Sequence, residues 1–369
     1  MTSINNVNLP AFFPDGTRGV VKCVDSADLK ACNIQGLVMN TYHLMTKPGA
    51  ATIKALGGLH KFTGWDRPII TDSGGFQVFS LLRENSSLGE IRPNEIIFRK
   101  DGKKTVLSPE KCIQSQLAYG SNVIMALDYC THPNDSYEIQ AKAVDVTIRW
   151  GKKCMDTFKK SKKESQIFGI IQGGNEEKLR KECAEALLEM GYTGFGFGGW
   201  PLDSEGRLTE DILAYTAQLI PDNFIKYAMG VGRPENIATC VKMGYTLFDC
   251  VIPTREARHN RLYVFNEEFE SQKNIETEGK FYNYLYIMDD SYRRDSRPIS
   301  NICDCHACQN YSRAYIRHLI SIGDTLGHRL KTMHNLRFYT MLMEVLCSKD
   351  FPSVNHRKAK HFPGISNEV

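Results

Sequence analysis

Residues 68–79 read PIITDSGGFQVF, a short apolar run that ends abruptly in a carboxylate, Asp72, followed by a serine and two glycines. The run is typical of a buried strand. Amphipathic segments separate it from similar runs elsewhere, and this alternation predicts parallel βα units. The candidate strands are residues 36–40, 68–71, 122–127, 168–171, 195–198, 227–231 and 246–249.

Two of the intervening segments carry clear helix signals. In residues 175–191 Asn175 is a candidate N-cap and Gly191 a stop, and in residues 233–244 Pro234 stands near the first helical position. The alternation of strand and helix signals is interrupted at about residues 82–110. There β-prone runs flank a KDGK turn and predict an inserted hairpin.

These signals predict an α/β protein built on a (β/α)8 TIM barrel, since one such barrel occupies about 250 residues. We expect residues 1–270 to form the barrel. From about residue 270 the sequence becomes loop-like, and the helical segments that follow have no strand partners. We therefore expect residues 271–369 to form a zinc-binding helical subdomain that packs on the barrel.

Composition narrows the class of protein only broadly. The 369 residues carry a formal charge of +4, which permits a nucleic-acid partner but does not require one. No run of 18 apolar residues and no secretion signal is present, so we expect a soluble, cytoplasmic protein without a membrane partner. Most of the 12 cysteines are then expected to be reduced.

Three cysteines need a separate explanation, because they crowd into CDCHAC at residues 303–308. Three thiolates and a downstream imidazole complete a tetrahedral shell for one structural Zn²⁺ per chain. Spacing alone leaves His306 and Cys347 as competing ligands, and a metal-free thiol cluster is a further alternative. The favoured ligands are Cys303, Cys305, Cys308 and His334.

Polar or glycine features stand at the end of nearly every candidate strand. In a barrel the carboxyl ends of the strands meet on one face, where active sites lie. A single Asp after a strand is more often an ordinary helix N-cap, but six features together favour a catalytic face. They are Asp72, Asp128, Gln172, Gly198-Gly199, Met229 and Asp249.

In order along the chain, the motifs resemble those of the tRNA-guanine transglycosylases, which exchange a guanine in tRNA for a 7-deazaguanine base. TDSGGFQV and FDCVIPTR are the most specific of them. The likeness runs from GTRGVVK at 16–22 and NTYHLMTKPG at 40–49 through TDSGGFQVFSL, MALDYCTHP, IIQGG, GFGFGG, AMGVGRP and FDCVIPTREARHNR to the cysteine cluster.

The resemblance implies a role for each acidic residue. Asp249 would be the nucleophile that bonds covalently to the ribose, and Asp72 the general acid/base, because retention at a sugar carbon requires two such groups. Asp128 would bind the amine and ring N–H of the base. For the zinc shell, the MHNLRF context of the family selects His334.

The remaining site residues are also implied by the resemblance. Gln172 and the Gly199 N–H would bind the base carbonyl, the backbone near Trp200 its 7-substituent, and Phe76 and Met229 its two faces. Guanidinium groups after the nucleophile would hold the anticodon loop around the wobble guanine, although a solvated basic loop is the alternative. These are Arg255, Arg258 and Arg261.

Departures from the family pattern leave the substrate open. Where bacterial members read like GGLAVGE, this chain reads GGWPLDSE, so that Ser204 replaces a glutamate and Glu205 lies one residue away. The incoming base is then 7-aminomethyl-7-deazaguanine or queuine. The resemblance implies a homodimer. Two alternative functions are a non-catalytic tRNA-binding subunit, against which Asp72 and Asp249 argue, and a DNA-directed deazapurine transglycosylase.

Overall fold

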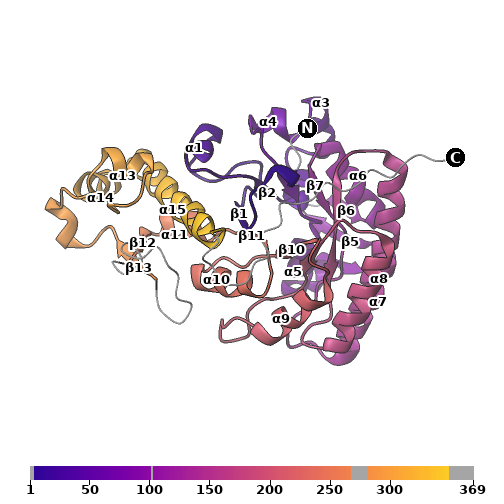
Figure 1. The fold of residues 1–369 in the computed structure, drawn as a ribbon. Helices are drawn as coiled ribbons and strands as arrows, with labels where there is room; N and C mark the ends of the chain where they lie inside the picture. Colours follow the sequence, from indigo (N-terminus) through magenta and orange to yellow (C-terminus); the bar gives the residue numbers. More distant parts are fainter. Residues whose placement is uncertain (1–3, 101–102, 267–280, 349–369) are drawn as a thin grey trace.

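The computed structural model describes residues 4–100, 103–266 and 281–348. Eight parallel strands form one sheet in the order β1-β11-β10-β9-β8-β7-β3-β2. A bridge between Asp15 and Val38 brings the two edges together into a nearly closed barrel, which confirms the predicted fold (Figure 1). The strands are β1 (Ala11–Pro14), β2 (Leu37–Met39), β3 (Ile69–Thr71), β7 (Val123–Met125), β8 (Gln166–Ile171), β9 (Gly194–Phe197), β10 (Ile225–Ala228) and β11 (Leu247–Cys250).

The sequence predicted seven of these strands and missed β1. This strand has four residues, directly follows Pro10 and ends at Pro14. It forms because Ala11 pairs with Leu247 of β11 and because Phe12 and Phe13 are buried. Such pairing is a tertiary contact that a single-sequence pattern does not contain.

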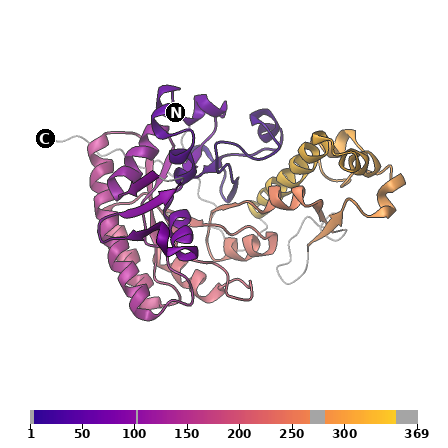
Figure 2. The same cartoon turned by 180° about the vertical axis from the view of Figure 1, so that it is seen from behind.

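Helices alternate with the strands around the barrel, and Figures 1 and 2 show α7 and α8 along one side of it. The helix α8 begins after Glu176 rather than after the expected cap Asn175, whereas Gly191, with φ +86°, ends it as predicted. Pro234 begins α10 as predicted. The main helices are α5 (Gly75–Glu84), α6 (Pro109–Tyr119), α7 (Tyr137–Ser161), α8 (Glu177–Met190), α9 (Glu210–Leu219), α10 (Pro234–Lys242) and α11 (Ile252–Arg258).

The shorter elements of the N-terminal part surround the first strands. The barrel interior is filled by side chains such as Met125, Phe168 and Leu247. The short elements are η1 (Ile4–Asn6), α1 (Ser26–Ala31), α2 (Thr41–Thr46), α3 (Ala50–Ala55), α4 (Leu59–Thr63) and η2 (Ser86–Leu88).

The predicted insertion is present between α5 and α6. It is an antiparallel sheet of β4 (Gly89–Ile91), β5 (Ile96–Lys100) and β6 (Lys103–Leu107). Phe98 of this sheet contacts Tyr42 of α2 with ring centroids 5.5 Å apart. The insertion therefore packs against the barrel near the end of β2.

The C-terminal part contains a hairpin and helices, and the expected boundary at residue 270 lies outside the described residues. Its last helix, α15, extends from this part to the barrel (Figures 1 and 2). The Tyr339 hydroxyl in α15 donates to the carbonyl of Gly232. The elements are β12 (Arg261–Phe265), β13 (Tyr282–Tyr286), η3 (Asp290–Arg294), α13 (His306–Asn310), α14 (Arg313–Ser321) and α15 (Thr325–Leu346).

None of the helices within the described ranges combines the length and the apolar character needed to cross a bilayer.

Candidate active site

A cavity of about 370 Å³ opens at the carboxyl ends of the barrel strands. This is the face on which barrel active sites lie, because the loops after the strands converge there. Most of the residues singled out in the sequence line it. They are Asp72, Phe76, Asp128, Gly199, Trp200, Met229 and Asp249.

Asp72 lies directly after β3 and is held by three donors. Its Oδ1 accepts from the backbone N–H groups of Thr41 and Gly74, at 2.9 and 3.0 Å, and its Oδ2 accepts from Asn40 Nδ2 at 2.6 Å. Burial raises the pKa of Asp72 to about 7 in spite of these donors. A carboxyl group with such a pKa can both give and take a proton near neutrality.

Asp249 stands on the end of β11, in the same cavity. Its Oδ1 accepts from the Gly230 N–H at 2.9 Å, and the Tyr227 hydroxyl is its second hydrogen-bond partner. Burial raises the pKa of Asp249 to about 6, which is below that of Asp72. Between these two values Asp249 is mainly ionised and Asp72 mainly protonated, which suits one nucleophile and one acid.

Asp128 and Gln172 form a buried pair beside the two carboxylates. Gln172 Nε2 donates to Asp128 Oδ2 at 2.6 Å, and the Ser73 hydroxyl approaches Asp128 Oδ1 at 3.4 Å. Burial raises the pKa of Asp128 to about 6. Gln172 Oε1 is buried without a hydrogen-bond partner, so the pair presents an unused acceptor and a carboxylate to a polar ligand.

Aromatic and thioether groups form the rest of the wall. Phe76 and Trp200 are 40% and 41% exposed, and the centroids of their rings lie 5.6 Å apart. Met229 lines the cavity and packs on Gly196, where an added Cβ would meet its sulfur at 2.7 Å. The cavity therefore offers apolar surface for a flat ring and polar groups for its edge.

Comparison with known proteins identifies the family. A family model described as queuine tRNA-ribosyltransferase matches residues 1–346. The chain belongs to this family. The match confirms the resemblance drawn from the motifs and makes the chain an enzyme of the transferase class.

Individual members of the queuine tRNA-ribosyltransferase family are similar over most of their length. A queuine tRNA-ribosyltransferase of Halothermothrix orenii is 41% identical over 345 residues, which are 93% of this chain and 87% of the relative. One of Lysinibacillus sphaericus is 42% identical over 91% of this chain and 83% of the relative. One of a Psychrobacter species is 38% identical over 92% of this chain and 85% of the relative.

The three arginines after Asp249 lie outside the cavity. Arg255 and Arg261 both contact the buried carboxylate of Glu256, at 3.4 and 2.7 Å, and Arg258 donates to the Thr254 hydroxyl. Arg255 remains exposed. They are gathered on α11 and at the start of β12, so the structure places them beside the site rather than in it.

The predicted metal ligands come together in one buried group. The ligand atoms of Cys303, Cys305, Cys308 and His334 all lie within 4.8 Å of one another, an arrangement that can hold a metal ion. His334 Nε2 contacts the Tyr263 carbonyl at 2.7 Å, which turns Nδ1 towards the thiols, 3.3 Å from Cys308 Sγ. Such an outer partner is usual for a metal-binding histidine.

The two competing ligands lie elsewhere. Cys347 Sγ donates to the Leu9 carbonyl at the other end of α15, and His306 Nδ1 contacts Asn310. Neither belongs to the buried group. Spacing could not exclude them, because His306 lies inside the cysteine cluster and Cys347, like His334, lies downstream of it.

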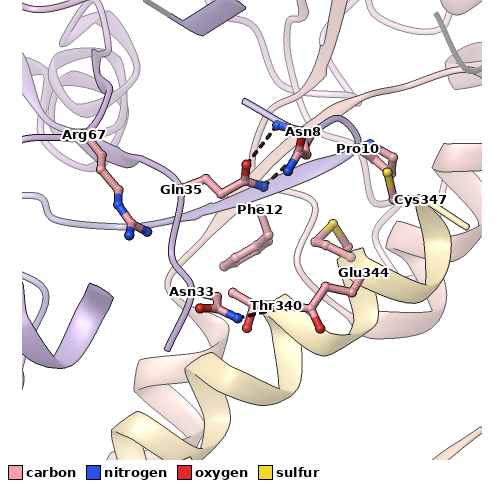
Figure 3. Close-up of a pocket in the computed structure, with 10 residues that line it drawn as sticks. Asn8, Pro10, Phe12, Asn33, Gln35, Arg67, Thr340, Glu344 and Cys347 are labelled. Atoms are coloured by element: carbon pink, nitrogen blue, oxygen red, sulfur yellow. Dashed lines mark hydrogen bonds between the residues drawn. The ribbon is translucent and has the colours of Figure 1, made fainter. Parts of the chain in front are cut away.

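A second cavity, of about 440 Å³, lies at the opposite end of the barrel, where β1 and β2 begin (Figure 3). Its polar side chains are mostly bound to one another or to the backbone. Asn8 and Gln35 share two hydrogen bonds, and Arg67 donates to the Ile34 carbonyl at 2.6 Å. Among the described residues that line this cavity, Glu344 is the one acid, so the carboxylate pair of the first cavity has no counterpart there.

Some residues of the site carried no assigned role in the sequence. Asn40 and Thr41 hold Asp72, and Tyr227 holds Asp249. Asn40 directly follows β2 as Asp72 directly follows β3, and this position was an available signal. Tyr227 lies within an apolar strand, where nothing in the sequence separates it from core residues.

Proposed function

We propose that the protein is a tRNA-guanine transglycosylase, which exchanges the guanine at the anticodon wobble position for a 7-deazaguanine base. The observation that carries this proposal is the pairing of Asp72 and Asp249 in one cavity beside the Asp128–Gln172 pair. Two carboxylates with different raised pKa values suit a double displacement at a sugar carbon. Membership of the queuine tRNA-ribosyltransferase family supports the tRNA substrate.

In the first displacement a carboxylate oxygen of Asp249 bonds to C1′ of the ribose. The C1′–N9 bond breaks, and its electron pair stays with the departing guanine. Asp72, which is mainly protonated below a pH of about 7, then supplies a proton to the base. The product is an ester between Asp249 and the emptied nucleotide.

In the second displacement the incoming base bonds to C1′ and the Asp249 carboxylate leaves. Asp72 takes up the proton that the incoming base loses, which restores the starting state. Two inversions at C1′ give overall retention. The short hydrogen bonds from Asn40 and Thr41 keep Asp72 in position for both transfers.

The base fits the cavity through three kinds of contact. Asp128 accepts from its amine and ring N–H, while Gln172 and the Gly199 N–H reach its carbonyl. Phe76 and Met229 cover the two faces, and the backbone near Trp200 meets the 7-substituent. Loss of water from these buried polar groups is offset only by a ligand with matching donors and acceptors, which favours guanine-like bases.

The incoming base is 7-aminomethyl-7-deazaguanine or queuine. The cavity wall next to Gly199 consists of Trp200, Pro201 and Leu202. Ser204 and Glu205 are exposed, and Glu205 is paired with Arg207 at 2.9 Å. Competition between the two bases in one exchange assay decides between them.

For the C-terminal part we propose one structural Zn²⁺, bound by Cys303, Cys305, Cys308 and His334. Three thiolates and an imidazole complete a tetrahedral shell and leave no position for a substrate. We further propose that residues 271–369 form a subdomain on a barrel of residues 1–270, and that the protein is a cytoplasmic homodimer.

The test is release of labelled guanine from a tRNA that carries guanine at the wobble position, with either 7-deazaguanine base added. Release is expected with the native protein and not with the Asp249→Asn variant. A DNA stem-loop with the same loop sequence is the control that distinguishes a tRNA substrate from a DNA substrate. Exchange on the DNA alone, or no exchange on the tRNA, would exclude the proposal.

A further inference from the structure

Arg180 is a fully buried cation next to the cavity. It lies in α8 and is 1% exposed. Its guanidinium donates to three backbone carbonyls, those of Gly174, Ile171 and Gly198, at 2.9, 2.8 and 3.0 Å. It also lies 4.0 Å from the ring centre of Phe197. One side chain thus ties the carboxyl ends of β8 and β9 together.

No carboxylate balances this charge among the residues that the structure describes. All three hydrogen-bond acceptors are neutral carbonyls, and the titratable groups that face the guanidinium are Tyr245, Cys183 and Cys130. Burial raises the pKa of each of these three groups, so they stay neutral near pH 7. Burial lowers the pKa of Arg180 to about 10, which still leaves it protonated.

An unpaired buried charge is costly to a fold, because the ion loses its hydration without gaining a counter-ion. Three carbonyl dipoles and one aromatic face offset part of that cost. A neutral side chain would tie the two strands without it. A negative charge that formed nearby would offset the remaining cost.

Such a charge would form next to Gly199, if the base carbonyl binds there as we propose. A Cβ built on Gly199 would lie 3.7 Å from Gln172 Oε1 and 3.9 Å from Arg180 Nη2. Gln172 itself follows Ile171, whose carbonyl Arg180 binds. Both groups that we assign to the base carbonyl are therefore held by residues in contact with Arg180.

We propose that Arg180 is a positioning residue for the exchange reaction, which acts through the carbonyl-binding groups that it contacts and stabilises the negative charge that the leaving base gains. This inference rests on the proposed function. When the C1′–N9 bond breaks, its electron pair remains on the base and spreads to the carbonyl oxygen. A fixed cation in a water-poor site stabilises that charge without reorganisation.

Two variants separate the charge from the strand contacts. Arg180→Lys keeps the charge but loses the planar fork, whereas Arg180→Gln keeps donors and loses the charge. Single-turnover release of guanine should be about 100-fold slower in Arg180→Gln. The dissociation constant for free guanine should change less than threefold, and Arg180→Lys should recover most of the rate. Thermal melting of each variant reports on folding.

The inference is wrong if Arg180→Lys and Arg180→Gln are equally slow, or if the rate loss is matched by an equal loss of guanine affinity. A purely structural role would produce either result. A native-protein measurement covers the case in which the variants do not fold. The affinity ratio of 8-azaguanine, which ionises near neutral pH, to guanine is followed from pH 5 to 8.

Both bases meet the same titrating protein groups, Asp72, Asp128 and Asp249. Ionisation of these acids at higher pH repels the anionic base, so it cannot be the cause of a rising ratio. Preference for the anionic base should make the ratio rise with pH. A flat or falling ratio would overturn the inference. This binding measurement needs no turnover, so it is distinct from the guanine-release assay in which the proposed function itself succeeds or fails.

Discussion

Gln172 Nε2 donates to Asp128 Oδ2 over 2.6 Å, so two residues that we assign to base recognition are bound to each other. Their bond lowers the pKa of Asp128 against the effect of burial, which nevertheless raises it to about 6. The pairing keeps the carboxylate satisfied in the free protein. A base that binds Asp128 has to compete with Gln172.

Gln172→Met is expected to weaken guanine binding about 10-fold at pH 8, because a hydrogen-bond donor is replaced by an apolar group of similar size. Without its donor, Asp128 should titrate at a higher pH. Calorimetric titration at pH 6 and 8 should therefore show a larger loss at pH 6. Gln77→Met, at another glutamine that lines the cavity, is the matched control. An equal loss of guanine affinity at both pH values would contradict the effect of Gln172 on the pKa of Asp128.

Asp249→Asn is expected to lower guanine exchange by at least about 1000-fold, since the amide cannot form the ester with the ribose. Denaturing gel electrophoresis of the native protein with tRNA should show a covalent complex. The variant should give none while still binding tRNA. A covalent complex that persists in Asp249→Asn would assign the nucleophile to another residue.

The pH dependence of exchange follows from the two raised pKa values. Asp249 attacks only when ionised, so kcat/KM should rise as pH increases through about 6. Asp72 donates only when protonated, so kcat/KM should fall as pH increases through about 7. A bell-shaped profile with its maximum between these values is expected. A profile flat from pH 5 to 8 would remove both assignments.

The same shift has a consequence for stability. Burial raises the pKa of Asp249 in the folded protein to about 6 from its ordinary value of 3.8, so the folded state binds the proton more tightly than the unfolded state. Protonated Asp249 therefore stabilises the folded protein below pH 3.8, its ordinary pKa, and this stabilisation is lost as pH rises through about 6. The melting temperature of Asp249→Asn minus that of the native protein should therefore increase between pH 4 and 6. Above pH 6 this difference should stay constant.

Arg255→Gln is expected to weaken tRNA binding and to make the slope of log Kd against log salt shallower by about 1, as for a lost phosphate contact. Filter binding over a salt series measures both. Lys160→Gln, in the exposed basic run of α7, is the control and should change neither. Equal effects of the two substitutions would indicate general attraction rather than a contact beside the site.

Cys308→Ser is expected to reduce bound zinc to well below one ion per chain and to lower the melting temperature by several degrees, because metal binding contributes to folding. Cys347→Ser should retain the metal, since that thiol bonds to the Leu9 carbonyl instead. Elemental analysis of the purified proteins decides. Native protein without zinc would refute the assignment.

Short sequence patterns were enough to predict the acids of the candidate active site and the metal-binding group. Asp72, Asp128 and Asp249 could be singled out because each directly follows an apolar run, and parallel strands in a barrel end on one face. The metal group was visible because three of its ligands lie within six residues. Predictions of this kind need only neighbours along the chain and the geometry of one repeated unit.

The sequence by itself therefore determined the barrel, the acids at its mouth and the thiol cluster. Tertiary structure alone decided that Ala11–Pro14 completes the sheet, that Gln172 pairs with Asp128, and that Arg180 donates to neutral carbonyls next to Gly199. The first two of these features join strands that are far apart in the chain, and only assembly of the barrel brings their residues within hydrogen-bond distance. Burial then sets their charge states, because it depends on every surrounding side chain at once.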